Sequence, residues 1–141
     1  MPRLGPDDVA CWLLKTTRPP HVIDPGWTPG GVRELTRCVR ASYRLGLMTA
    51  GAPCLLWLSG RADPGVHAIG AVLGAPRPGP DGPLVDVRLR LLAEPVPRGA
   101  LLADARARTA EVLRMPAGSN PSWLSDPEFA AVHDLLEAPG A

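Results

Sequence analysis

The stretch Leu84–Leu92, with the sequence LVDVRLRLL, alternates between apolar and charged side chains and is the clearest strand signal in the chain. In an extended chain, one side carries Val85, Val87, Leu89 and Leu91, and the other carries Asp86, Arg88 and Arg90. A period of two predicts a β-strand with one buried face. The chain must therefore fold around a sheet.

Three further segments predict strands of that sheet. They are residues 11–15 (CWLLK), 52–60 (APCLLWLSG) and 66–74 (VHAIGAVLG). The last two flank a turn at Asp63-Pro64-Gly65 and predict a hairpin. Residues 75–83 (APRPGPDGP) predict a loop, because a stretch so rich in proline and glycine forms neither a helix nor a central strand.

Helices are expected in three places. Thr28 and Pro29 look like an N-cap followed by the first helical residue, and Gly46 would end that helix. Its buried stripe would be Val32, Leu35, Val39 and Tyr43. Residues 101–113 predict a second helix, residues 115–123 a loop, and the capping box Ser125–Glu128 a final helix. These elements predict an α+β fold in one domain over residues 1–141, with its core at about 10–137.

Composition narrows the class of protein. Hydrophobic residues make up 45% of the 141 residues, but no apolar run approaches the ~18 residues of a membrane helix. The start, MPRLGPDDVA, lacks the basic and apolar regions of a secretion signal, so a cytoplasmic protein without membrane contact is expected. The three cysteines and three histidines are scattered, which predicts reduced, buried thiols and neither a metal site nor a cofactor.

Charge is unevenly distributed, although the net charge is only +1. Residues 1–61 hold eight basic and four acidic side chains, whereas residues 99–141 hold three basic and six acidic ones. This asymmetry is compatible with an anionic partner on the N-terminal half.

No catalytic motif is present. The sequence lacks G-x-S-x-G, a P-loop, G-x-G-x-x-G and H-E-x-x-H. Cys54 and His67 could be a nucleophile and its base, but both lie in apolar predicted strands, so core positions are the better interpretation. A protein that is not an enzyme is expected.

Four arginines follow one another in the first predicted helix. Arg33, Arg37, Arg40 and Arg44 are spaced four, three and four residues apart, which places them on one helical stripe. Such a stripe could contact a phosphate backbone, or it could be a solvated helix face.

Four of the six aromatic residues are tryptophans. Trp12 and Trp57 lie in predicted strands and Trp123 precedes the last helix, whereas Trp27 stands alone in a turn-rich stretch. An indole there could be a stacking platform for a base, or it could close the end of the helix as a packing residue.

The order of these landmarks resembles the EVE family and is similar to the YTH family. The segments that carry it are CWLLKTT, the isolated Trp27, the arginine-rich stretch, CLLWLSG, GVHAIGAVLG and VDVRLRLLAEPV. The resemblance implies a PUA-like pseudo-barrel, mostly antiparallel β-sheet with flanking helices. It also implies a pocket for a modified base flipped out of its strand, which costs a few kcal/mol.

The resemblance further implies a set of site residues. The base-binding pocket would be lined by Lys15, Thr16, Thr17, Trp27, Thr28, Trp57, Ser59 and Gly60. Phosphates would be held by Arg33, Arg37, Arg40 and Arg44, and the supporting loop would be Asn120, Pro121 and Ser122. Unlike in YTH domains, the 75–83 loop carries no cage tryptophan, and Trp57 could be a cage wall or a core residue.

Together these observations favour a non-catalytic domain that binds DNA or RNA and recognises a modified, methylated base in an aromatic-lined pocket. A nuclease or restriction protein is a possible partner. One alternative is a module that binds small molecules or nucleotides in the same pocket. Another is a protein-interaction adaptor in a defence system.

Overall fold

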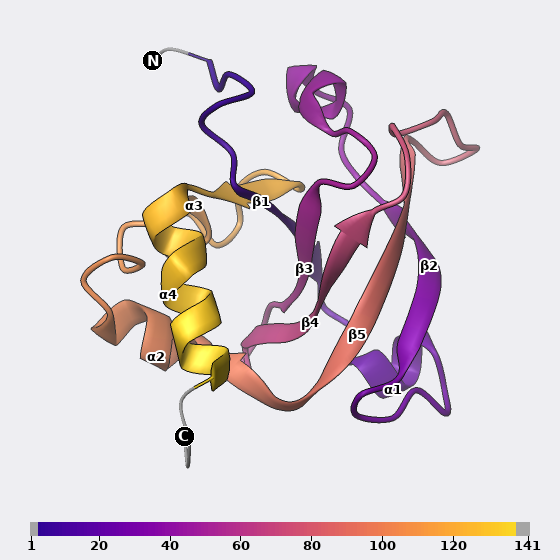
Figure 1. Ribbon diagram of the computed structural model, residues 1–141. Coiled ribbons are helices and arrows are strands. Elements are labelled where there is room, and N and C mark those ends of the chain that lie inside the picture. The colour runs from indigo at the N-terminus through magenta and orange to yellow at the C-terminus, as the bar shows by residue number, and fades with distance from the viewer. Residues whose placement is uncertain (1–2, 138–141) are drawn as a thin grey trace.

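The computed structural model describes residues 3–137 (Figure 1). The predicted domain of residues 1–141 therefore extends beyond the described residues at both ends. In chain order the elements are β1 (Cys11–Thr16), α1 (Pro20–Ile23), β2 (Val32–Cys38), the 3-10 helix η1 (Tyr43–Leu47), β3 (Pro53–Leu58), β4 (Gly65–Val72), β5 (Leu84–Pro97), α2 (Arg98–Ala103), α3 (Glu111–Arg114), β6 (Ser122–Leu124) and α4 (Asp126–Glu137).

The six strands form one curved sheet in the order β2-β5-β4-β3-β1-β6. Only β1 and β3 run parallel, and the other neighbours, including the predicted β3–β4 hairpin, are antiparallel. Helices α2, α3 and α4 gather beside the β1 and β3 end of the sheet, whereas β2 and α1 lie on the opposite side of the molecule (Figure 1). The predicted class of an antiparallel sheet with flanking helices is confirmed.

Two hydrophobic clusters explain the apolar runs CWLL and CLLW. In β1, Leu13 belongs to the cluster that packs against the helices, and its neighbour Trp12 belongs to the cluster inside the curved sheet. In β3, Leu55 and Leu56 divide in the same way. A strand buried on both faces needs apolar residues at every position, so these strands show no alternation.

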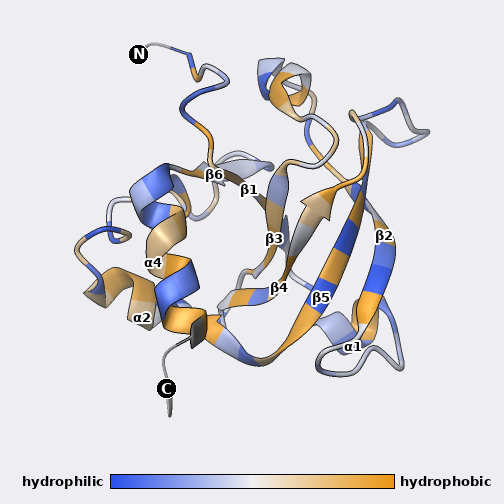
Figure 2. Ribbon diagram, viewed as in Figure 1, coloured by the Kyte–Doolittle hydropathy of each residue, from blue (hydrophilic) through white to orange (hydrophobic). Residues whose placement is uncertain are grey.

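Strand β5 has the alternation expected of a strand with one buried face. Val85, Val87 and Leu89 are fully buried, and the charged positions between them are partly or largely exposed, which appears as alternating colours along the ribbon (Figure 2). The strand continues through residues 93–97 and ends at Pro97. Gly70 of β4 crosses it so closely that a Cβ there would lie 1.7 Å from the Arg88 carbonyl oxygen.

The predicted helix over residues 29–46 is wrong. Val32–Cys38 form an edge strand that pairs with β5 over seven residues, and only Tyr43–Leu47 form a short 3-10 helix. The apolar spacing that suggested a helix is overridden by the pairing with β5, and the β-branched Val32 and Thr36 suit a strand. The four arginines therefore do not form a helical stripe.

The C-terminal helices are partly as expected. Residues 101–113 are not one helix, because α2 ends at Ala103 and the Asp104 side chain accepts a hydrogen bond from the Arg106 amide in the turn that follows. Residues 122 and 123, predicted as loop, belong to β6. Helix α4 begins as predicted, with the Ser125 amide donating to the Glu128 carboxylate at 2.8 Å. Within residues 3–137, no helix is long and apolar enough to cross a membrane.

Candidate nucleic-acid interface

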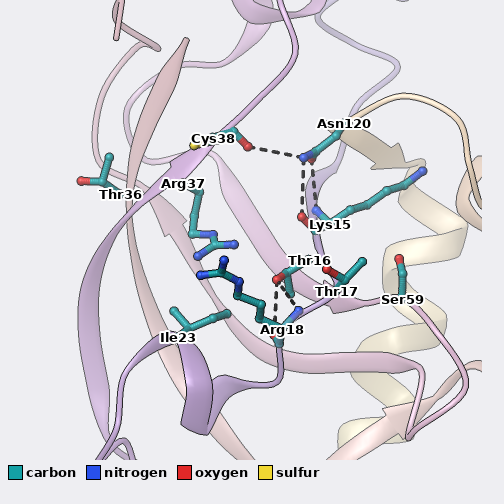
Figure 3. Close-up of a pocket in the computed structure, with 10 residues that line it drawn as sticks. All are labelled: Lys15, Thr16, Thr17, Arg18, Ile23, Thr36, Arg37, Cys38, Ser59 and Asn120. Carbon is teal, nitrogen blue, oxygen red and sulfur yellow. Dashed lines mark hydrogen bonds between the residues drawn. The ribbon is translucent and has the colours of Figure 1, made fainter. Parts of the chain in front are cut away.

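A pocket of about 530 Å³ opens between the end of β1 and the end of β2, within the size range of ligand sites (Figure 3). Its lining residues are Lys15, Thr16, Thr17, Arg18, Ile23, Thr36, Arg37, Cys38, Ser59 and Asn120. They come from β1, α1, β2, the residue after β3 and the loop before β6. Strands that are not neighbours in the sheet therefore meet at this site.

Asn120 connects the two strands that border the pocket. Its Oδ1 accepts a hydrogen bond from the Lys15 amide at 3.1 Å, and its Nδ2 donates to the carbonyl oxygens of Lys15 and Cys38 at 3.5 and 3.4 Å. The Asn120 carbonyl also accepts from the Arg40 amide at 2.7 Å. The side chain is thus engaged in holding β1 beside β2, as expected for a supporting loop.

The pocket is positively charged. Lys15, Arg18 and Arg37 line it, and within residues 3–137 no carboxylate does. The guanidinium groups of Arg18 and Arg37 turn toward each other (Figure 3). Burial lowers the pKa of Arg37, and the charge of Arg18 adds to this effect. Two like charges in a half-buried site favour an anionic ligand, which would neutralise both.

Lys15 is held at one side of the pocket. Its Nζ donates to the Pro116 carbonyl at 3.3 Å. Burial lowers the pKa of Lys15, Glu111 opposes this shift, and Arg44 and Arg40 reinforce it.

The other arginines expected to contact phosphates lie in different surroundings. Arg33 forms an ion pair with Asp24 at 3.1 Å. Arg40 is exposed beside Asn120. Of the four arginines predicted from the helical stripe, Arg37 is the one that lines the pocket.

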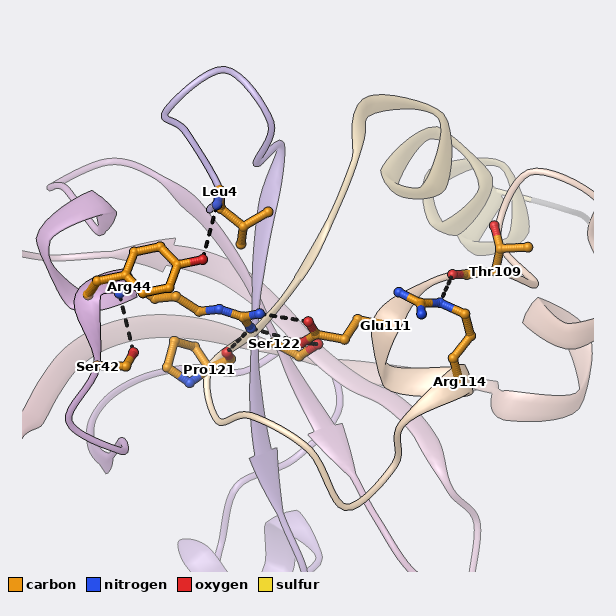
Figure 4. Close-up of polar contacts among 9 residues, drawn as sticks. Leu4, Ser42, Arg44, Thr109, Glu111, Arg114, Pro121 and Ser122 are labelled. Atoms are coloured by element: carbon orange, nitrogen blue, oxygen red, sulfur yellow. Dashed lines mark hydrogen bonds and ion pairs between the residues drawn. The ribbon is translucent and has the colours of Figure 1, made fainter. Parts of the chain in front are cut away.

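Arg44 forms a bidentate ion pair with Glu111, at 2.8 and 2.7 Å, and both side chains are only 12% exposed (Figure 4). Arg44 also donates to the Pro121 carbonyl at 3.0 Å, and the Ser122 hydroxyl donates to Glu111 at 2.9 Å. The hydrogen bond from Arg44 holds the pKa of Glu111 below its ordinary value. This network fixes the loop that carries Asn120.

The expected aromatic walls are not among the lining residues. Trp27 is 5% exposed, packs in the cluster inside the sheet and donates from Nε1 to the Gly31 carbonyl at 2.8 Å. Trp57 is 3% exposed and packs against the helices. Thr28 and Gly60 are exposed and lie outside the lining set as well. Both tryptophans occupy core positions, but Trp27 does not close the end of a helix, because the residues that follow it form β2.

Four lining residues were missing from the sequence prediction: Arg18, Ile23, Thr36 and Cys38. Arg18 follows directly on the polar end of β1, which was a signal in the sequence. No sequence signal pointed to Thr36 and Cys38, because they line the pocket as part of strand β2, and the predicted helix would have placed them elsewhere. Cys38 is exposed, whereas the sequence predicted buried thiols.

Cys54 lies in the core rather than in a catalytic pair. Burial raises its pKa to about 12, so it is held as a thiol and is a poor nucleophile. His67 is buried, with Nε2 2.7 Å from the Asp63 carbonyl oxygen. Within the described residues, no group of three or more His, Cys, Asp or Glu side chains could hold a metal ion.

The similarity of this chain to known proteins lies in its structure. No protein-family model matches the sequence, and no curated protein matches it. A crystal structure of a Pseudomonas syringae protein is 14% identical, with a TM-score of 0.69, and the match covers 90% of this chain and 99% of that one.

Two human structures match as well. The DUF55 domain of human thymocyte nuclear protein 1 is 17% identical, with a TM-score of 0.59, over 89% of this chain and 98% of that one. Human THYN1, solved in complex with 5-methylcytosine-containing DNA, is 16% identical, with a TM-score of 0.57, over 91% and 98%.

The fold is therefore that of a PUA-like domain. Within this class, the matches are to structures of the EVE or DUF55 type, over about 90% of the chain. The fold expected from the sequence resemblance is confirmed.

Proposed function

We propose that this domain binds nucleic acid and takes a base, turned out of its strand, into the pocket between β1 and β2. The observation that carries this proposal is the cluster of Lys15, Arg18 and Arg37 around a pocket that no carboxylate lines within residues 3–137. Cations of this kind bind phosphates and release counterions. A protein of the same fold has been solved with DNA bound, which supports this ligand class.

The lining residues suggest a division of roles. Arg37 and Arg18 would hold a phosphate, and the exposed Arg40 would extend that contact along the backbone. The planar guanidinium groups can also stack on a base, as aromatic side chains do. Thr17 and Ser59 would supply hydroxyl groups for hydrogen bonds to the base.

We further propose that the base is modified, with 5-methylcytosine as the first candidate. That base is present in the DNA bound to human THYN1. Ile23, from α1, is the aliphatic side chain in the lining and could contact a methyl group. In this proposal, contact with Ile23 and stacking on arginine take the place of the two tryptophan walls that the sequence resemblance implied.

The test is binding of labelled oligonucleotides, measured by fluorescence anisotropy. The panel would contain unmodified cytosine, 5-methylcytosine, 5-hydroxymethylcytosine and N6-methyladenine, in DNA and in RNA, with free nucleotides as competitors. Arg37→Gln is expected to weaken binding and to lower the slope of log K against log salt by roughly 0.7 to 0.9, the loss of one phosphate contact.

Arg33→Gln is the matched control. Arg33 lies on the same face of β2 but is paired with Asp24, so its loss should change binding much less. Equal effects of the two variants would contradict the assignment of Arg37 to the site. Equal affinity for every modification would overturn modified-base recognition, and binding of free nucleotides alone would favour a nucleotide-binding module.

A further inference from the structure

The Asn120 side chain shows how a planar amide fits between two strand edges. Its carboxamide lies between β1 and β2 and uses both its donor and its acceptor on backbone groups of Lys15 and Cys38 (Figure 3). The Asn120 carboxamide, whose donor and acceptor resemble the polar edge of a base, therefore fills the space between the two strands at one end of the pocket.

Along β2, the backbone N–H and C=O groups of successive residues point in opposite directions. The Val39 amide donates to the Pro83 carbonyl at 3.1 Å, and the Gly31 carbonyl accepts from the Leu91 amide at 3.0 Å. Odd-numbered residues of β2 therefore direct their backbone groups toward β5, and even-numbered residues direct theirs outward. The contact of the Cys38 carbonyl with Asn120 agrees with this alternation.

Thr36 is the next outward-facing residue along this edge. It lies two residues, about 7 Å, from Cys38. Its side chain donates to Asp86 at 2.6 Å and points away from the pocket (Figure 3). Thr36 nevertheless lines the pocket, and its outward backbone N–H and C=O are the polar groups that the alternation along β2 leaves without a partner in β5.

We infer that the hydrogen-bonding edge of the base docks on the backbone N–H and C=O of Thr36, one step along β2 from the Cys38 carbonyl that Asn120 contacts, as the Asn120 carboxamide docks on the N–H and C=O of Lys15. This inference rests on the proposed function. The ligand needs a donor and an acceptor side by side, as in the N4 amine and N3 of cytosine. A methyl group at C5 leaves that edge unchanged, so the same backbone contact accepts 5-methylcytosine.

The first test removes only the donor. Thr36→Pro deletes the outward N–H, a change that an edge strand tolerates on its free side. It is expected to weaken binding of the 5-methylcytosine oligonucleotide about tenfold or more, since a base acceptor would lose its partner. Glu34→Pro, which deletes an equivalent outward N–H beyond the pocket, is the control and should bind like wild type.

A second test uses the wild-type protein, so it does not depend on a variant that folds. An oligonucleotide with N4,N4-dimethylcytosine lacks the amine donor and should bind about tenfold more weakly than its cytosine counterpart. If wild type binds no oligonucleotide, the proposed function fails as well. If wild type binds, but Thr36→Pro binds as well as Glu34→Pro and the dimethylated base binds normally, only the Thr36 contact is overturned.

Discussion

At the scale of single residues, tryptophan is used for packing. Trp12, Trp27 and Trp57 are almost fully buried, and Trp123 packs on the cluster inside the sheet. Trp27 is isolated in the sequence because the loop that carries it folds back over that cluster. Its indole N–H bonds to the loop backbone at Gly31, so it fixes the entry to β2.

Replacing Trp27 tests this structural role. Trp27→Ala should lower the free energy of unfolding by about 3 to 5 kcal/mol through the cavity it leaves. Trp27→Phe should cost less, because it keeps an aromatic ring and loses mainly the hydrogen bond to Gly31. Urea unfolding measures both. A Trp27→Ala protein with wild-type stability and lost base preference would instead support a cage wall.

At the scale of elements, the ion pair of Arg44 and Glu111 joins η1 to α3, and through Ser122 to β6. Neither short helix has enough internal hydrogen bonds to be stable alone. The pair is only 12% exposed, so loss of one partner leaves a poorly solvated charge. The loop before β6 thus depends on residues far from it in sequence.

Glu111→Gln should therefore lower the free energy of unfolding by about 3 kcal/mol at pH 7. The pKa of folded Glu111 lies below its ordinary value of 4.5. The stabilisation that the charged Glu111 gives the folded state is thus complete above pH 4.5, and it is lost as the pH falls through the lower, folded pKa. Urea unfolding should show that wild type is more stable than Glu111→Gln at pH 7 and that this difference is smaller at pH 3.

The control for this prediction is Glu94→Gln, which changes an exposed residue of β5 without an ion pair in the described residues. Its stability should stay within about 0.5 kcal/mol of wild type. A Glu111→Gln deficit that is the same at both pH values would show that the charge of Glu111 is not what stabilises the loop.

At the scale of the whole molecule, closure of the curved sheet creates the pocket. β2 lies at one edge of the sheet and β6 at the other. The edges meet through Asn120, whose backbone carbonyl bonds to the Arg40 amide just beyond β2. Beside this bridge, β1 and β2 are not paired with each other and the pocket lies between them. The ligand would enter there.

Asn120→Ala should open this bridge. Three side-chain hydrogen bonds would be lost, and the free energy of unfolding should fall by about 2 kcal/mol. Amide hydrogen exchange by NMR should become faster at Lys15 and at Arg40. Ser119→Ala, next to it in the loop, is the control and should change neither. Faster exchange at Lys15 with no change at Arg40 would show that the side chain orders β1 without closing the sheet.

Local sequence patterns were sufficient to predict the elements whose pattern reflects their own burial. The alternation in β5, the apolar runs of β1 and β3, the turn at Asp63-Pro64-Gly65 and the capping box at Ser125 each encode a local environment. The family resemblance also pointed to the polar end of β1 and to Asn120, which line the pocket.

The nature of β2 and the lining of the pocket depend instead on long-range contacts in the folded molecule. A strand such as Val32–Cys38 is stabilised by pairing with β5, a segment about 50 residues away, and no local pattern records such a partner. Ion pairs with residues distant in the fold likewise distinguish the arginines: Arg37 lines the pocket, whereas Arg33 and Arg44 are neutralised by Asp24 and Glu111. Whether an arginine is free to bind a ligand depends on long-range contacts, because these contacts determine whether a carboxylate lies beside its guanidinium group.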